Sequence, residues 1–447
     1  MVSAVVRHDA DPARNPLPRQ HVLVLGGALI AALIAVAVVI VDQVRGGPAD
    51  VKLRSGDVVF VERGTGARFI YAGGRLHPVL NLTSGLLATD DDHPTTMEVR
   101  QGALATQMRE QHVGLGATLG IPDAPDTLPP ARDLLTAPWQ ICTTLTTTGA
   151  ASSRLLLDPG AVHGGHQLTA AAAGTPGEAL LVTTGVTDPL SLVYGGRRFE
   201  IRDEPAALTV FGWTRRQARI VAAGWLNTLP AGPDLQPTPP ARLGAASAVD
   251  GVPVGRLFRT AGPNGSTLWA VARRTDTLRL TDLQARLLLA DPAAHRGEPV
   301  AVDLAVFSGL PAAKSTPDDG QDQWPPTAPT LAPATTSCLT VRDPAAPIVV
   351  RTDPTGAGLS GTADGTVDVP AGRAALVESA ASPAALPGSG TYSLVTDTGR
   401  RYPLVDRAVA TRLGYDPAAA QRMPAGLVAL IPSGPALDPG AARQPRP

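Results

Sequence analysis

The chain has 447 residues, of which 44% are hydrophobic and 4% aromatic, and its formal net charge is −1. Such a length favours about three domains, whose cores must be built mainly from Ala, Val and Leu. The balanced charge argues against nucleic acid as a partner, because nucleic-acid-binding proteins carry a broad basic surface. The 46 Gly and 44 Pro residues predict many turns, short strands and few long helices.

An uncharged apolar run from Val22 to Val41 predicts a membrane-spanning helix. At 1.5 Å per residue it would be about 30 Å long, which matches the hydrocarbon core of a bilayer. Because three arginines precede it, residues 1–21 should stay in the cytoplasm and the C-terminal bulk should be exported. A cleaved signal peptide is the alternative, but the run is long for one and no cleavage signal follows. We expect an uncleaved single-pass membrane anchor.

The only two cysteines, Cys142 and Cys338, lie in the part expected to be exported, where the environment is oxidising. One disulfide between them is the favoured interpretation, and two separate buried thiols are the alternative. The bond would close a loop of roughly 200 residues, which chain-entropy arguments credit with about 5 kcal/mol at most.

One small unit recurs four times in the exported part. Each copy has an alternating apolar segment, a short turn, a second alternating segment and a helical pattern, which together predict a β-hairpin leading into a helix. An earlier strand that begins near a glycine precedes each hairpin. The hairpin and helix segments begin at Ala67, Leu190, Thr267 and Thr391.

The register of the four copies agrees. A residue in each hairpin turn stands six positions before a residue type that commonly caps helices, so its side chain should accept a bond from the first helical turn. The turn residues are Arg75, Arg197, Asp276 and Arg400, and the predicted N-caps are Asn81, Asp203, Asp282 and Asp406. Units this small bury little surface alone, so they should pack on neighbours or on a common core.

The spacing of the four copies is long, short, long, and each long gap holds one cysteine. This predicts two pseudo-symmetric halves whose insertions meet in a disulfide-tied central domain. The predicted fold is α+β, mainly antiparallel β, with an elongated pseudo-twofold ectodomain of four β-rich repeats after the membrane helix. The expected parts are a cytoplasmic N-terminus (1–21), the span (22–41), repeat 1 (42–110), the first central half (111–170), repeat 2 (171–235), repeat 3 (236–310), the second central half (311–366), repeat 4 (367–432) and a tail (433–447).

Three stretches carry a family resemblance: RLHPVLNLTSGLLA from Arg75, LGIPDAPDTLP from Leu119, and TDTGRRYPLVDRAVATRLGYD with the following VALIPSGPALDP, which ends at Pro439. With the single span, the repeats and the two cysteines, the chain resembles the EccB family, the anchored subunit of type VII (ESX) secretion systems. The resemblance covers nearly the whole chain. Family members have a longer cytoplasmic N-terminus with an amphipathic helix, of which only the end matches here.

The resemblance implies a structural, non-catalytic inner-membrane core component of a secretion complex. It implies pairing of Cys142 with Cys338 and periplasmic repeats that mediate assembly and the exit path of exported proteins. The implied partners are the motor ATPase EccC, the subunits EccD and EccE, the protease MycP and further copies of the chain. No cofactor or metal is implied.

Members of the family are sometimes described as ATP-hydrolysing, which makes an ATPase the first alternative function. The nearest phosphate-loop candidate, Gly309 to Ser315, has Ala313 where a glycine is required, and Pro311 lacks an N–H donor. A periplasmic cell-wall-binding module is the second alternative, and it predicts exposed aromatics near the hairpin turns, such as Tyr71, Tyr194 and Tyr402. Two histidine-containing loops, His163 to His166 and Asp90 to His93, could bind a cation but are better explained as solvated loops.

Overall fold

The structure, a computed structural model, describes residues 24, 27–36, 53, 56–158, 160, 162, 164–172, 175–313, 320–357, 359 and 365–446. Several residues considered above lie outside the described part of the chain: residues 1–21, His163, Lys314 and Ser315. The predicted span is described only at Val24 and over 27–36, and these residues are helical. No helix within the described residues has the length and apolar character needed to cross a membrane.

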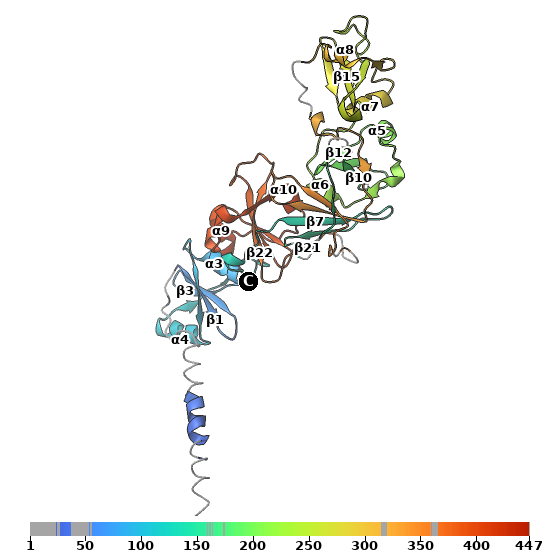
Figure 1. Ribbon diagram of the computed structural model, residues 1–447. Helices are drawn as coiled ribbons and strands as arrows, with labels where there is room; N and C mark the ends of the chain where they lie inside the picture. Colours follow the sequence, from blue (N-terminus) through green and yellow to red (C-terminus); the bar gives the residue numbers. More distant parts are fainter. Residues whose placement is uncertain are drawn as a thin grey trace, which may run out of the picture. The chain divides into compact units, whose positions relative to one another are not determined.

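The described chain forms two compact units (Figure 1). Unit 1 comprises the residues up to Leu128 together with Thr411–Leu413 and Leu437–Pro447, and unit 2 comprises Pro129–Ala410 and Gly414–Ala436. Both units are mixed α and β, with mainly antiparallel sheets. This confirms the predicted α+β class.

Unit 1 is built on a five-stranded sheet. Its order is β4 (Thr95–Val99), β1 (Val58–Glu62), β2 (Arg68–Ala72), β3 (Arg75–Pro78) and β5 (Gly114–Leu115), accompanied by α3 (Leu82–Ala88) and α4 (Ala103–Glu110). β1, β2 and β3 form an antiparallel meander, and β4 returns parallel to β1. The turn between β2 and β3 is Gly73-Gly74, and both glycines have the positive φ that a two-residue hairpin turn requires.

The same order of strands recurs in three sheets of unit 2. The first has β12 (Arg197–Glu200), β11 (Ser191–Tyr194), β10 (Glu178–Thr183) and β13 (Arg219–Ile220), with α5 (Glu204–Phe211) and α6 (Ala223–Thr228). The second has β16 (Thr277–Leu280), β15 (Thr267–Ala272), β14 (Leu257–Ala261) and β17 (Val300–Ala301), with α7 (Asp282–Ala290) and α8 (Leu304–Ser308). The third has β24 (Arg401–Pro403), β23 (Thr391–Thr396), β22 (Ala374–Ala380) and β25 (Gln421–Pro424), with α9 (Arg407–Arg412) and α10 (Ala425–Val428).

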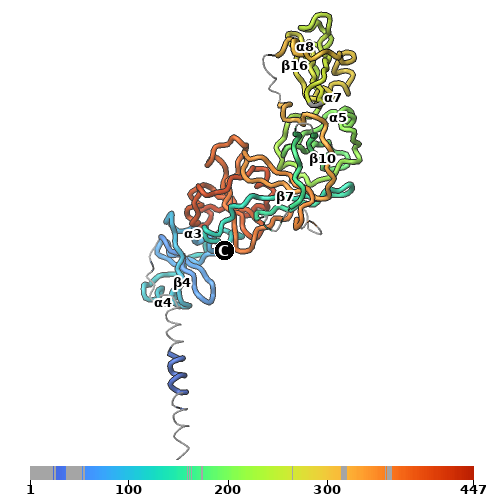
Figure 2. Tube along the Cα trace, viewed as in Figure 1, coloured from blue at the N-terminus to red at the C-terminus, as the bar shows by residue number. Residues whose placement is uncertain are grey.

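Each sheet therefore holds more than the three strands and one helix expected from the sequence. A fourth strand returns parallel to the first, and a second helix follows it. The added strand is only two residues long in β13 and β17, which is too short to produce a recognisable alternation. Within unit 2, α5 and α7 lie side by side, as Figures 1 and 2 show.

A six-stranded sheet lies between the sheets of β10 and β22 in unit 2. Its order is β21 (Thr366–Asp368), β8 (Ser153–Leu156), β7 (Trp139–Thr144), β19 (Thr336–Val341), β20 (Val349–Thr352) and β9 (His166–Gln167). β7 and β19 pair antiparallel over their full lengths. Each also forms a hairpin with its following strand. Two hairpins far apart in the sequence thus meet edge to edge.

One apolar core joins this six-stranded sheet to two of its neighbours in unit 2. Trp139 and Leu339 come from the six-stranded sheet, Trp225 from α6, and Val377 and Met423 from the sheet of β22. All five side chains are fully buried. Because burial of a large apolar side chain is worth roughly 1.5–3 kcal/mol, this shared core fixes the three sheets together.

The C-terminal segment completes unit 1. α11 (Pro439–Ala442) packs on α3, and β26 (Pro445–Arg446) pairs antiparallel with β6 (Thr118–Leu119). The Arg446 guanidinium donates to the Gly120 carbonyl at 2.9 Å. The C-terminal segment therefore belongs to the same unit as α3 and β6.

Removing the disulfide should destabilise unit 2 without changing its fold. We expect the double variant Cys142→Ala, Cys338→Ala to lose at most about 5 kcal/mol of unfolding free energy, because the unfolded chain regains the conformational entropy that closing a loop of roughly 200 residues removes. Chemical denaturation followed by tryptophan fluorescence measures this, since Trp139 and Trp225 lie in the unit 2 core. Wild-type protein under reducing conditions is the control, and an unchanged midpoint in both would contradict the expectation.

Candidate functional site

The pairing of Cys142 with Cys338 is the best-defined feature predicted from the sequence. The two residues stand directly opposite each other on β7 and β19, with their Cα atoms 4.0 Å apart, and their sulfurs form a disulfide. Both residues are buried, and they pack with Leu156, Ala357 and Leu359. The short Cα separation is typical of a non-hydrogen-bonded antiparallel pair, where facing side chains approach most closely.

Side chains beside this disulfide link the central sheet to the neighbouring sheets. The Trp139 indole N–H donates to Gln421 Oε1 at 3.0 Å, and Gln421 Nε2 donates to the Ala137 carbonyl at 2.7 Å. On the other side, Thr143 Oγ1 accepts from the Ala222 N–H at 3.1 Å. These bonds satisfy polar groups that burial would otherwise penalise.

Backbone pairing also crosses between the halves of the sequence. β18 (Thr330–Leu331), which precedes β19, pairs parallel with β10. Leu134, which precedes β7, forms a parallel bridge with Ala374 of β22. The segment before β7 therefore pairs with the sheet of β22, and the segment before β19 pairs with the sheet of β10. In both cases the paired strand is far away in the sequence.

Asp353 holds the start of β19 in place, a role that the amino-acid sequence did not indicate. Its Oδ1 accepts from the backbone N–H and hydroxyl of both Thr335 and Thr336, at 2.8–3.3 Å. Asp353 also has a φ of 47°, a conformation that Asp tolerates better than most residues. Burial raises the pKa of the Asp353 carboxyl, but the four hydrogen bonds from the threonines outweigh it and lower the pKa.

The predicted helix caps lie at or next to the starts of their helices. Asn81 accepts from Ser84 N, Asp203 from Ala206 N and Asp406 from Val409 N. The prediction of Asp282 as an N-cap was wrong. The N-cap of α7 is Thr281, and Asp282 is the first helical residue. The Thr281 side chain and Gln284 form a reciprocal capping box, which satisfies two backbone donors and so wins over a cap by Asp282.

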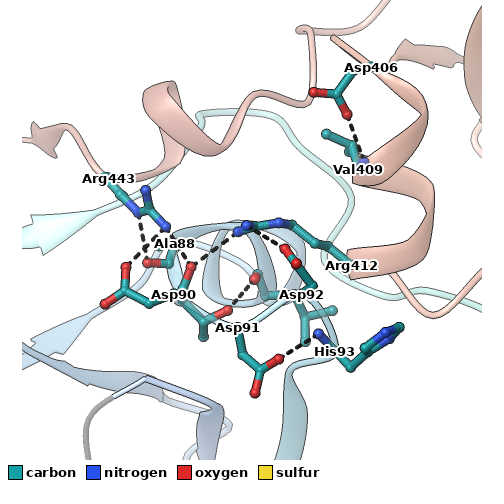
Figure 3. Close-up of polar contacts among 11 residues, drawn as sticks. Ala88, Asp90, Asp91, Asp92, His93, Asp406, Val409, Arg412 and Arg443 are labelled. Atoms are coloured by element: carbon teal, nitrogen blue, oxygen red, sulfur yellow. Dashed lines mark hydrogen bonds and ion pairs between the residues drawn. The ribbon is translucent and has the colours of Figure 1, made fainter.

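The acidic loop after α3 is held by arginines of unit 1 (Figure 3). Arg412 pairs with Asp92 at 2.8 Å and Arg443 with Asp90 at 3.2 Å. Both arginines also donate to the carbonyl of Thr89, which ends α3. Cations near a helix C-terminus are stabilising, so the loop is better explained as part of the helix cap than as a cation site.

The second histidine loop is also engaged in an internal pair. His166 Nε2 lies 2.7 Å from Glu178 Oε2, and Thr169 donates to the same carboxylate. Burial raises the pKa of Glu178, while the bonds from His166 and Thr169 outweigh it and lower the pKa. Within the described residues no group of three His, Cys, Asp or Glu could hold a metal ion.

The phosphate-loop candidate uses its N–H groups internally. The N–H groups of Gly309 and Leu310 donate back to carbonyls of α8, and that of Ala313 donates to the Thr277 carbonyl at 3.0 Å. Thr277 in turn donates to the Pro311 carbonyl. A phosphate loop needs such N–H groups aimed at the ligand, so the described part of this segment is unsuited to one.

Asp353 supports a prediction that varies with pH. Replacing it with Ala should cost about 1–3 kcal/mol at pH 7, because four donors lose their acceptor. Asp353→Asn keeps one acceptor oxygen and the tolerance of positive φ, and should cost less. Because the folded-state pKa is lowered, the stability that ionised Asp353 contributes is present above the unfolded pKa of about 4 and is lost as pH falls through the folded pKa. Denaturation at pH 7 and at pH 3 measures this, and a wild-type advantage over Asp353→Asn that does not shrink at pH 3 would contradict it.

The chain is similar to proteins of a known family. The family model described as "Type VII secretion system ESX-1, transport TM domain B" matches residues 1–446. The chain is 27% identical over 482 residues to "ESX-3 secretion system ATPase EccB3" of Mycolicibacterium smegmatis, covering 99% of this chain and 87% of the relative. It is 26% identical over 268 residues to "ESX-5 secretion system ATPase EccB5" of Mycobacterium tuberculosis H37Rv, covering 57% of this chain and 49% of that relative. The match thus spans about half the length of the ESX-5 relative.

Solved structures share the fold. An intact ESX-5 inner membrane complex contains a chain with a TM-score of 0.65 and 20% identity, and the match covers 100% of this chain and 92% of that one. A structure titled as an EccB3 dimer from the ESX-3 core complex gives 0.62 and 22%, covering 86% and 99%. Identities this low support the fold alone. The family match over nearly the full length goes further, and the chain belongs to the EccB family of type VII secretion systems.

Proposed function

We propose that this chain is a structural, non-catalytic subunit of an inner-membrane type VII secretion complex. Val22 to Val41 would be its single membrane span, with residues 1–21 in the cytoplasm and the rest in the periplasm. The observation that carries this proposal is the family match over residues 1–446, which includes the apolar run. A charge-free run of this length has the hydropathy that membrane insertion requires.

We further propose that the periplasmic part contains four repeats around a central domain with pseudo-twofold symmetry. The support is the strand order shared by the sheets that contain β1, β10, β14 and β22. The antiparallel pairing centred on Cys142 and Cys338 has the geometry of a local twofold axis. Two further pairings agree with such an axis: Leu134 pairs with Ala374, and Thr330 pairs with Glu178, so each half of the sequence pairs with the other. Within unit 2, a shared apolar core holds the surfaces of three sheets in fixed positions, which suits a scaffold.

The proposed partners are further copies of the chain, the motor EccC, the subunits EccD and EccE and the protease MycP. Two solved structures of the same fold support this choice, because their titles describe an ESX-5 inner membrane complex and an EccB3 dimer. In this scheme EccC consumes the ATP, while this chain shapes the exit path for exported proteins.

An ATPase is the second candidate, because several relatives are named as secretion-system ATPases. The internal use of the N–H groups of Gly309, Leu310 and Ala313 argues against the nearest phosphate-loop candidate. The cell-wall-binding alternative is weaker still. It requires exposed aromatics, yet Tyr194 and Tyr402 are buried, and the Tyr194 hydroxyl accepts from the Ala171 N–H.

Purification from native membranes tests the assembly proposal. We expect affinity-tagged full-length chain, solubilised in mild detergent, to recover the other secretion subunits, as identified by mass spectrometry. The control replaces Val22 to Val41 with a cleavable signal peptide, which should release the chain and abolish their recovery. Recovery of the full-length chain without any secretion subunit would count against the proposal.

Turnover assays separate the two candidate functions. Full-length chain purified free of other ATPases should hydrolyse ATP no faster than the background, and Lys314→Ala with Ser315→Ala should leave the rate unchanged. The reason is that the backbone N–H groups of the preceding segment already donate to carbonyls of α8 and β16. Turnover that follows this chain through purification, and that the double variant removes, would favour the ATPase.

A further inference from the structure

A pocket of about 270 Å³ opens in unit 2 where α6, α10 and the turn between β19 and β20 meet. Four of the residues that line it are apolar and buried, namely Leu229, Val341, Ile348 and Leu427. Arg198 of β12 also belongs to the lining. Sites for small molecules combine an apolar lining with a few polar groups in the same way.

The two helices at this pocket differ in how their glycines are covered. α6 and α10 pack against each other (Figure 1), and each has glycine as its second residue. A Cβ atom on Gly224 of α6 would lie 2.9 Å from the Leu430 side chain, so this leucine covers Gly224. A Cβ atom on Gly426 of α10 would meet no described atom within 4 Å, and Gly426 lines the pocket.

Thr228 accounts for the open space. It stands at the sixth position counted from the start of α6, as Leu430 does from the start of α10. Its shorter side chain turns back on its own helix, where Thr228 Oγ1 donates to the Gly224 carbonyl at 2.8 Å. The space that a leucine takes beside one glycine is therefore left open beside the other.

The Arg198 side chain brings an unused donor to this pocket. Its Nε is buried, and no described residue accepts a hydrogen bond from it. The counterpart in the sheet of β22 is Arg401, because the carbonyls of both arginines accept from a glycine N–H, that of Gly232 or that of Gly434. Arg401 Nε donates to the Ile431 carbonyl at 3.1 Å. A buried donor without an acceptor is unfavourable, so a ligand that supplies an acceptor to Arg198 is stabilised.

The acid in the lining is already occupied. Asp343 lies 3.6 Å from the Arg422 guanidinium and accepts from a backbone N–H of its own turn. Asn227 and Ser382, the amide and hydroxyl side chains in the lining, are exposed to solvent. Because guanidinium groups match carboxylates in charge and geometry, the pocket fits a molecule with one carboxylate and an otherwise apolar body. A peptide fits less well, since its amide N–H groups would need acceptors.

We propose that this pocket binds a small apolar monocarboxylate, whose carboxylate accepts from Arg198 and whose hydrocarbon part lies beside Gly426. Since a cavity of about 150 Å³ holds benzene, 270 Å³ corresponds to about ten non-hydrogen atoms. The ligand class is therefore a free short fatty or aryl acid. This inference goes beyond the proposed assembly role, because it assigns a small-molecule site within unit 2.

Ligand-observed NMR titration of the full-length chain in lipid nanodiscs tests the site. The probe is phenylacetate, which has about ten non-hydrogen atoms, and phenylacetamide is the matched probe without charge. We expect phenylacetate to saturate the site below about 10 mM, the weak limit for a ligand of this size. Phenylacetamide should bind at least about tenfold more weakly, because it cannot form a charge-assisted pair with Arg198.

Three variants locate the binding. Arg198→Met removes the charge and the donor, so it should weaken phenylacetate binding at least about tenfold and abolish the preference over phenylacetamide. Thr228→Leu fills the space beside Gly426 and should prevent both probes from binding. Arg197→Met is the control and should change neither, because adjacent residues of a strand point to opposite faces of the sheet.

Opposite results overturn the proposal. No saturable phenylacetate binding up to about 10 mM excludes the site. Unchanged binding by Arg198→Met or by Thr228→Leu excludes it too, provided that circular dichroism shows the variant folded. If Arg198→Met does not fold, Thr228→Leu decides alone.

Two further measurements separate the proposal from its neighbours. Tighter binding of N-acetylphenylalanine than of phenylacetate identifies the C-terminus of a polypeptide as the occupant and contradicts a free acid. Recovery of the secretion subunits from membranes is scored independently of probe binding. Its loss contradicts the proposed function, whereas normal recovery without probe binding contradicts only the carboxylate site.

Discussion

The antiparallel pairing of β7 with β19 is the constraint on which unit 2 depends. It joins two hairpins that are 196 residues apart in the sequence, and the disulfide fixes their register at Cys142 and Cys338. Beneath it, Trp139 and Leu339 share a core with Trp225 and Met423. Because the neighbouring sheets contribute to that core, they are positioned by a pairing that neither of them contains.

The strand pairings that precede β7 and β19 also tie the neighbouring sheets to the central sheet. The segment before β7 extends the sheet of β22, and the segment before β19 extends the sheet of β10. Contacts between residues so far apart carry a large loop-closure entropy, which must be offset by extensive burial. Unit 1 follows the same principle, since α11 and β26 at the end of the chain complete the layer around α3 and β6.

Several ionisable groups of the described residues stabilise the fold through internal hydrogen bonds and ion pairs. The acidic loop after α3 ends a helix together with Arg412 and Arg443, Glu178 holds His166 and Thr169, and Asp353 organises the start of β19. Each of these groups is held by internal partners within the described residues.

Local patterns in the sequence determined the hairpins, the turn glycines at Gly73-Gly74 and the caps at Asn81, Asp203 and Asp406, because each depends on residues within one turn or one strand pair. The spacing of the cysteines also predicted the Cys142–Cys338 bond, which the structure contains. The cap of α7 at Thr281 is also local, because Thr281 and Gln284 form a capping box that the sequence contains as Thr-x-x-Gln. Only the tertiary structure revealed the parallel fourth strands and the role of Asp353. These features are set by partners distant in sequence, so the free energy that selects them exists only once the sheets have assembled.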